Sequence, residues 1–188
     1  AAGIDPITIT VTQKAKTVGP EPQANLLFPG SDFEDWSAFT GNLTTHGLKG
    51  YATQSPNGRN GSAMHISHEN TPGNDYIFTS ILKENLPSKP SKIIFYINGT
   101  GGKSLSLNVY SGNDYKAFNL GDCTTDTQVE VAANNQYTGV INTSGKWVKV
   151  TLNVAGIDVS QTAGQNIFAL KIGREVAYDL LIDDITFE

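Results

Sequence analysis

Short stretches of alternating apolar and polar residues run along most of the chain, and a period of two is typical of β-strands. The clearest example is Ser-Leu-Ser-Leu-Asn-Val-Tyr at 104–110, whose leucines and valine share one face. Comparable strands are predicted at 62–67, 76–82, 92–98, 115–120, 137–141, 146–154, 167–172 and 178–188. The pattern predicts about eight or nine strands and little or no helix.

The connections between these strands favour a β-sandwich. The strands recur at intervals of roughly ten to twenty residues, with turn residues between them rather than helical patterns. A stretch rich in glycine, proline and asparagine at 41–61 reads as mostly turns, and 121–136 reads as a long polar loop. We therefore expect an all-β sandwich rather than a βαβ fold.

The first 24 residues differ from the rest of the chain. Residues 7–12 alternate as a strand would, and Gly-Pro-Glu-Pro at 19–22 reads as a stiff linker because proline fixes φ and extends the chain. We expect 1–24 to be an N-terminal strand with a linker and 25–188 to be the main domain.

The last predicted strand, 178–188, carries a carboxylate in an apolar row. With a period of two, Leu181, Asp183, Ile185 and Phe187 share one face. A buried carboxylate is costly unless it is paired, hydrogen-bonded or bound to a metal. Asp183 therefore needs a partner elsewhere in the chain.

Composition narrows the classes of function. The net charge is -5 with 13 lysines and arginines, which argues against binding through nucleic-acid phosphates. No apolar run approaches the roughly 20 residues of a membrane-spanning helix. A single cysteine allows neither an intrachain disulfide nor a thiolate cluster for zinc. We expect no nucleic-acid partner, no membrane span and a monomer.

Several segments resemble known families. Four segments carry one resemblance: NLLFPGSDFEDW at 25–36, GSAMHIS at 61–67, GKWVKVTLNV at 145–154 and YDLLIDDITFE at 178–188. In this order they resemble the galactose-binding-like jelly-roll domains, which include carbohydrate-binding modules and surface domains of Bacteroidetes. ITITVTQKA at 7–15 resembles the closing strand of the immunoglobulin-like BACON domain. The resemblance implies a jelly-roll sandwich over 25–188, preceded by the remnant of another module.

The jelly-roll resemblance also implies a structural calcium ion between the two ends of the domain. Its ligands would be Asp32, Glu34 and Asp183, with carbonyl oxygens from 58–61. Calcium takes six to eight oxygen ligands and accepts such a mixed set. The alternative is that Asp183 accepts hydrogen bonds from backbone amides or pairs with a lysine.

Carbohydrate-binding modules stack aromatic rings on sugars and use amides to contact the hydroxyls. Trp36 and Trp147 occupy segments in which such residues are usually structural. Strand parity points instead to outward-facing side chains. The predicted ligand-binding residues are Tyr96, Tyr110, Tyr115, Asn108 and Asn119.

Together these observations predict a non-catalytic module of an exported bacterial surface protein that binds a polysaccharide or glycan. The alternative is a structural or adhesion domain of a surface lipoprotein without a sugar site. A glycan-active enzyme would need two carboxyl groups facing each other across an open cleft. The acidic residues instead gather where the resemblance implies calcium, so we do not expect an enzyme.

Overall fold

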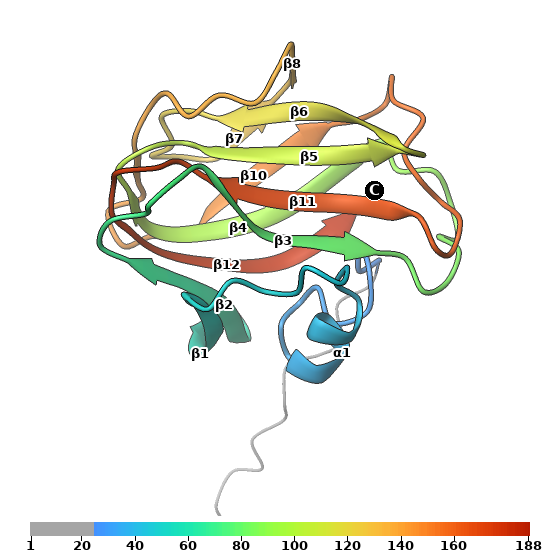
Figure 1. Ribbon diagram of the computed structural model, residues 1–188, viewed down its shortest axis with the longest axis horizontal. Coiled ribbons are helices and arrows are strands. Elements are labelled where there is room, and N and C mark those ends of the chain that lie inside the picture. The colour runs from blue at the N-terminus through green and yellow to red at the C-terminus, as the bar shows by residue number, and fades with distance from the viewer. Residues whose placement is uncertain (1–24) are drawn as a thin grey trace, which may run out of the picture.

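The computed structural model describes residues 25–188, which form two β-sheets packed face to face (Figure 1). The predicted strand at 7–12, the linker at 19–22 and the BACON-like segment lie outside the described residues. Twelve strands and one short helix, α1 (Trp36–Gly41), make up the fold of 25–188. The prediction of an all-β sandwich with little helix is confirmed.

One sheet has seven strands, and its order is β1-β2-β12-β4-β10-β7, with β9 pairing with β4. All its neighbours are antiparallel except β10 and β7. Its strands are β1 (Ala52–Gly58), β2 (Gly61–His68), β4 (Lys92–Gly101), β7 (Thr127–Val129), β9 (Ile141–Asn142), β10 (Val148–Asn153) and β12 (Tyr178–Phe187).

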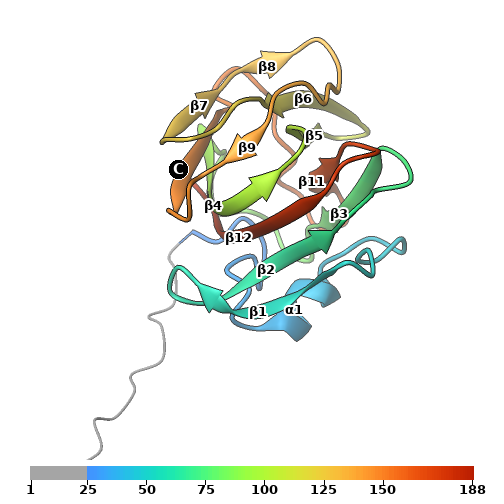
Figure 2. The same ribbon diagram turned by 90° about the vertical axis from the view of Figure 1, so that its left-hand side faces the viewer.

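The second sheet has five antiparallel strands in the order β3-β11-β5-β6-β8. They are β3 (Asp75–Ile81), β5 (Leu105–Ser111), β6 (Asp114–Leu120), β8 (Val131–Ala132) and β11 (Asn166–Ile172). This sheet faces the viewer in Figure 1, and Figure 2 shows it on the right of the seven-stranded sheet. No helix in 25–188 is long and apolar enough to cross a membrane.

The core lies between the sheets and follows the predicted alternation. Leu107 and Val109 of β5 and Phe168 and Leu170 of β11 are fully buried in it. Burying a side chain of this size contributes about 1.5–3 kcal/mol. This gain fixes which face of each strand points inward, and therefore which residues point outward.

The structure adds strands that the pattern did not predict. β1 lies within 41–61, which was expected to be mostly turns, and it pairs with β2 through an irregular register between Ser55 and Gly58. Proline, glycine and asparagine disfavour strands, so pairing with β2 overrides local preference here. In turn, 137–141 is not a full strand, because only Ile141 enters the two-residue β9.

The last strand corrects the prediction about Asp183. A β-bulge shifts the pairing of β12 with β4 between Asp183 and Thr186. Before the bulge Leu180 and Ile182 enter the core, and after it Ile185 does. An extra residue at a bulge reverses the inward and outward parity of the later residues of the strand. Leu181 and Asp183 therefore lie on the outer face, and the prediction that they share a face with Ile185 was wrong.

A cluster of aromatic rings closes the lower edge of the sandwich beside α1. The carboxylate of Asp35 caps this helix by accepting a hydrogen bond from the amide of Ala38. Phe39 is fully buried at the centre of the cluster. Its ring centroid lies 4.9 Å from Phe33, 5.0 Å from Trp36 and 5.3 Å from Phe78. Trp36 is thus a packing residue, as its sequence context indicated.

Replacing Phe39 with alanine should lower the free energy of unfolding by about 3–5 kcal/mol, because it opens a cavity among the neighbouring aromatic rings. Urea unfolding followed by tryptophan fluorescence measures this loss. The matched control is Val140→Ala at a side chain that is 54% exposed, which should change stability by less than about 0.5 kcal/mol. Equal effects of the two substitutions would contradict this description of the core.

Candidate ligand-binding face

The outer surface of the five-stranded sheet carries tyrosine and amide side chains. Tyr76 comes from β3, Lys171 from β11, Asn108 and Tyr110 from β5, and Tyr115 and Asn119 from β6. Those on β5, β6 and β11 face outward because the alternate residues of these strands occupy the core, and Tyr76 shares their face because it pairs with Lys171. We call this set, Tyr76, Asn108, Tyr110, Tyr115, Asn119 and Lys171, the tyrosine face.

Three tyrosine rings are neighbours on this face. Tyr110 and Tyr115 are directly paired across β5 and β6, and their ring centroids are 5.9 Å apart in an edge-to-face arrangement. Tyr115 and Tyr76 are 45% and 38% exposed, so both offer ring surface to a ligand. Burial, reinforced by the neighbouring phenols, raises the pKa of Tyr76 and of Tyr110. Both phenols therefore stay neutral hydrogen-bonding groups at ordinary pH.

The amides of the tyrosine face orient its other side chains. Asn108 is fully buried, and its Nδ2 donates to the hydroxyl of Tyr76 at 3.4 Å. Asn108 Oδ1 accepts from Nδ2 of Asn135 at 2.7 Å. Asn119 Oδ1 accepts from the backbone amide of Gln136 at 2.9 Å. These two predicted binding residues thus position Tyr76 and the loop that contains Asn135 and Gln136.

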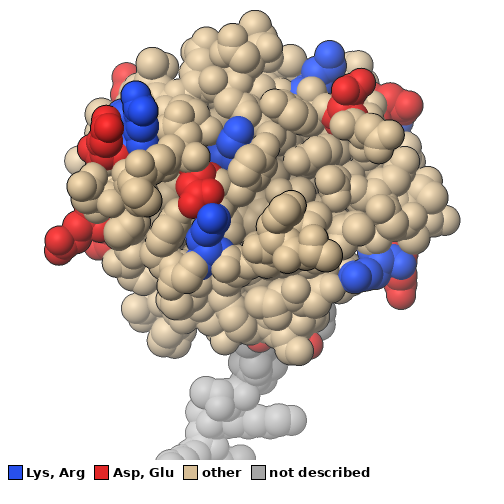
Figure 3. Space-filling model, viewed as in Figure 1, with Lys and Arg blue, Asp and Glu red and all other residues tan. Residues whose placement is uncertain are grey.

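Two hollows flank the tyrosine pair. One, of about 610 Å³, is lined by Tyr76, Tyr110 and the loop 44–47. The other, of about 570 Å³, is lined by Tyr115, Ala117 and residues 131–134. Because Tyr110 contacts Tyr115, the rings lie between the two hollows. The surface seen in Figure 3 carries most of its charged side chains near its margins.

Tyr96 lies elsewhere. It belongs to β4 and lies on the outer face of the seven-stranded sheet, opposite Asp183 of β12. The guanidinium carbon of Arg59 lies 3.9 Å from the centroid of its ring, a cation–π contact. Four of the five predicted ligand-binding residues thus share one face, and Tyr96 is separated from them by the thickness of the sandwich.

Three residues of this region, Tyr76, Lys171 and Asn135, were not among the ligand-binding residues predicted from the sequence. Lys171 lies between the buried Leu170 and Ile172 of β11, so parity alone could have pointed to it. Tyr76 has the parity of the buried Phe78, and it faces outward because the pairing of β3 with β11 is irregular between Leu170 and Lys171. The position of Asn135 depends on how a polar loop folds over β6, which no local pattern predicts. Parity gives the face of a strand, but it does not show which strands lie side by side.

Carboxylates gather at the opposite sheet, around the turn between β1 and β2. Asp183 is fully buried, and its Oδ2 accepts from the amide of Arg59 at 2.7 Å while its Oδ1 accepts from the amide of Asp184 at 2.8 Å. Asp184 Oδ2 accepts from Nε and Nη2 of Arg59 at 2.9 and 2.7 Å. Backbone amides, one of the two predicted alternatives, therefore satisfy Asp183.

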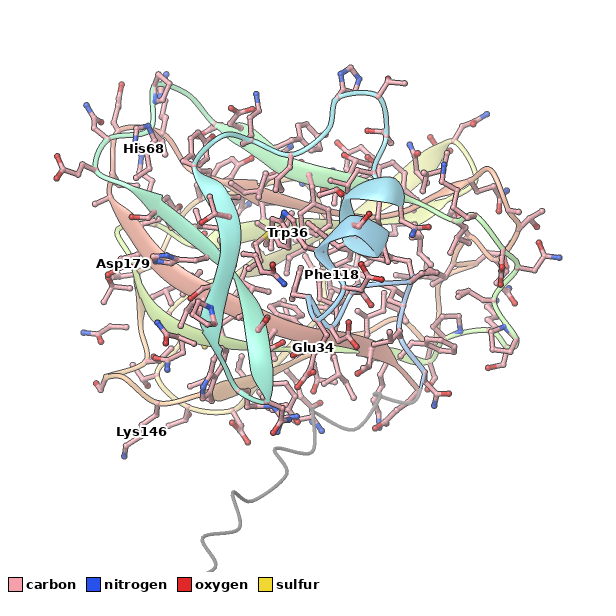
Figure 4. All side chains as sticks on the ribbon, turned by 90° about the horizontal axis from the view of Figure 1, so that it is seen from below. Glu34, Trp36, His68, Phe118, Lys146 and Asp179 are labelled. Atoms are coloured by element: carbon pink, nitrogen blue, oxygen red, sulfur yellow. The ribbon has the colours of Figure 1, made fainter. Side chains whose placement is uncertain are left out.

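The N-terminal acidic loop reaches the same turn. Glu34 Oε1 accepts from the amide of Ser62 at 2.8 Å, and Figure 4 shows Glu34 beside the β1–β2 hairpin. Gly61 makes this approach possible, because a Cβ there would lie 2.4 Å from Glu34 Oε1. Asp32 Oδ1 accepts from the amide of Glu34 at 3.4 Å. We call Asp32, Glu34, Asp183 and Asp184 the carboxylate corner.

The carboxylate corner holds more negative charge than Arg59 neutralises. Burial, followed by the neighbouring charge of Asp184, raises the pKa of Asp183 to about 7. Burial also raises the pKa of Glu34, with Asp32 and Asp184 adding to the effect. Such oxygen donors suit calcium in kind. In their described arrangement, however, both oxygens of Asp183 already accept hydrogen bonds, and no three His, Cys, Asp or Glu side chains in 25–188 gather as metal ligands would.

Comparison of the chain with protein-family models, with curated proteins and with solved structures gave no match. The resemblance to galactose-binding-like domains therefore stays a prediction. Because one fold serves many functions, function has to be argued from the tyrosine face and the carboxylate corner themselves.

The raised pKa of Asp183 predicts how stability depends on pH. The folded protein holds this proton more tightly than the unfolded chain, whose aspartates titrate near 3.8. Ionisation of Asp183 should therefore lower the free energy of unfolding as the pH rises from about 4 to about 7, by at most about 4 kcal/mol. Asp183→Asn should lack this component.

Melting temperatures of the wild type and Asp183→Asn, measured from pH 4 to 7 with chelator present, check this prediction. The difference between the two proteins should shift in favour of the variant as the pH rises. A difference that stays constant over this range would show that Asp183 is ionised throughout.

Proposed function

We propose that residues 25–188 form a non-catalytic carbohydrate-binding domain that recognises a polysaccharide or glycan on the tyrosine face. The observation that carries the proposal is the grouping of Tyr76, Tyr110 and Tyr115 on one sheet surface flanked by two hollows. Tyrosine rings offer flat apolar surface to the C–H faces of sugar rings, and their hydroxyls contact the ring substituents.

The shape of the region suits a chain better than a small molecule. The hollows lie on either side of the Tyr110–Tyr115 pair rather than forming one enclosed cavity. An extended saccharide crossing β3, β11, β5 and β6 would place successive rings in the first hollow, over the tyrosines and in the second hollow. This arrangement supports binding within a polymer.

The setting proposed for this domain is an exported protein at the bacterial cell surface, with the domain acting as a monomer. It rests on the resemblance to surface domains of Bacteroidetes. A structural or adhesion domain is the second candidate. The observation that favours it is that Asn108 and Asn119 use their amides within the protein, leaving fewer polar groups for a sugar.

Substituting the exposed rings tests the proposed function. Tyr115→Ala and Tyr76→Ala should each weaken binding to the recognised polysaccharide by at least about tenfold, because a central aromatic anchor contributes more than about 1.4 kcal/mol. Tyr96→Ala, on the other sheet, should leave binding unchanged. Affinity electrophoresis on a panel of plant, host and microbial polysaccharides measures this.

The outcomes separate the two candidates once melting curves show that the variants are folded. Retention that depends on Tyr76 and Tyr115 but not on Tyr96 supports sugar binding on the tyrosine face. Retention of no polysaccharide favours the structural or adhesion domain. Retention lost only in Tyr96→Ala would place a site on the other sheet.

Calcium at the carboxylate corner is also a proposal. It is supported by the excess of buried carboxylates and by the all-oxygen chemistry of Asp32, Glu34 and Asp183. The ion would neutralise charge at the place where both ends of the domain meet the β1–β2 turn. Its role would be to stabilise the fold, since the corner belongs to the sheet opposite the tyrosine face.

Calcium added to chelator-treated protein should raise the melting temperature by several degrees, because saturation at about 100 times the dissociation constant contributes about 2.7 kcal/mol. Magnesium, which demands tighter octahedral geometry, should raise it less. Glu34→Gln should reduce the calcium effect. Glu130→Gln, which follows β7 at the edge of the seven-stranded sheet opposite β1, serves as the charge-matched control. An unchanged melting temperature would exclude a structural calcium ion.

A further inference from the structure

Lys171 is the cation of the tyrosine face. On β11 it pairs with Tyr76 of β3 on one side and with Ser106 of β5 on the other. Its ammonium nitrogen lies 4.5 Å from the centroid of the Tyr76 ring and donates to Oδ1 of Asn135 at 2.5 Å. Asn135 in turn donates to Asn108, so the charge is joined to the network that orients the face.

Lys171 has no carboxylate partner in the part of the chain that the structure describes. Ion pairs within 4.0 Å there engage Lys49, Arg59, His65, Lys89, Lys92 and Arg174. Asp75, which precedes Tyr76 on β3, is paired with Lys49 at 3.0 Å. The ammonium group thus contacts neutral groups and an aromatic ring.

This environment is unfavourable for a charge in the free protein. Partial burial lowers the pKa of Lys171, since removing an ammonium group from water disfavours its charged form. The amide oxygen of Asn135 and the ring of Tyr76 compensate only in part for the lost hydration of the ammonium group. An ammonium group has three N–H donors, so donors are left beyond the one used by Asn135. An anion bound at this place would supply the missing charge in surroundings where such contacts are strong.

We propose that the saccharide bound on the tyrosine face is acidic, and that its carboxylate or sulfate group binds the ammonium group of Lys171. The proposal rests on the proposed function and specifies its substrate class. A sugar ring packed against the part of the Tyr76 ring that Lys171 leaves exposed would bring a ring substituent within reach of the ammonium group of Lys171. Neutral sugars need no cation here, because amides and hydroxyls suffice for their hydroxyl groups.

Matched polysaccharides test the proposal. Polygalacturonate supplies carboxylates, its fully methyl-esterified form supplies the same backbone without charge, carrageenan supplies sulfates, and unsubstituted galactan and glucan are neutral. Affinity electrophoresis gives the retention, and calorimetry with oligosaccharides of the retained polymers gives the affinities. The proteins are the wild type, Lys171→Gln, Lys171→Arg, Tyr115→Ala and the control Lys146→Gln, which removes an equal charge from an exposed lysine far from the face.

We expect retention by at least one acidic polysaccharide, and the carboxylate and sulfate arms show which anion is recognised. Lys171→Gln should weaken that binding by about tenfold or more, since hydrogen bonds to charged groups exceed neutral ones by this order. Lys171→Arg should preserve most of it because the charge is kept, and Lys146→Gln should preserve all of it. The melting temperature of Lys171→Gln should stay close to that of the wild type.

Three results would overturn the proposal, and they are distinguishable. Binding of a neutral polysaccharide that is lost in Tyr115→Ala but unchanged in Lys171→Gln would leave the proposed function intact and exclude an acidic ligand. Retention of no polysaccharide of any kind would contradict both the acidic ligand and the proposed carbohydrate-binding function. Acidic binding that Lys171→Gln and Lys146→Gln weaken equally would show a general charge effect rather than a contact with Lys171.

Discussion

The burial of alternate residues of β5 and β11 against the seven-stranded sheet determines the rest of the structure. Leu107 of β5 pairs with Leu170 of β11, and both side chains reach the core only if the two strands keep this register. The same register turns Tyr110 and Lys171 outward. A slip of one residue would exchange the two faces and bury the polar side chains, so core and candidate site are specified by one pairing. The tyrosine face is in this sense a consequence of the core.

The carboxylate corner belongs to the seven-stranded sheet. A bulge between Asp183 and Thr186 keeps β12 in the sheet, while Asp183 and Asp184 turn their carboxylates toward Arg59 in the β1–β2 turn. Glu34 reaches this turn from the start of the domain, and the amide of Leu27 donates to the carbonyl of Ile185 nearby. The corner therefore joins the two ends of the domain. Since it lies on the sheet opposite the tyrosine face, stability and ligand binding can be altered separately.

Much of this organisation was predictable because it depends on local alternation. The strands around Tyr110 and Tyr115 and the outward direction of both rings follow from apolar neighbours two residues apart. The misplaced residues depend on non-local features. Tyr96 was grouped with the other tyrosines because parity does not assign a strand to a sheet. The predicted face of Asp183 was wrong because a bulge reverses the parity of a strand, and the sequence gives no signal of this bulge. Lys171 gained its significance only when the structure showed it without a carboxylate partner among residues 25–188.

Nuclear magnetic resonance of the isotopically labelled protein can locate a bound saccharide. Its position decides whether the tyrosine face is the binding site. Titration with an oligosaccharide of the polymer that the protein retains should shift amide signals of β3, β5, β6 and β11, together with the loop 134–136. Signals of β1, β2 and β12 around the carboxylate corner should stay in place. Shifts concentrated on the seven-stranded sheet, near Tyr96 and Asp183, would contradict the assignment of the tyrosine face as the binding site.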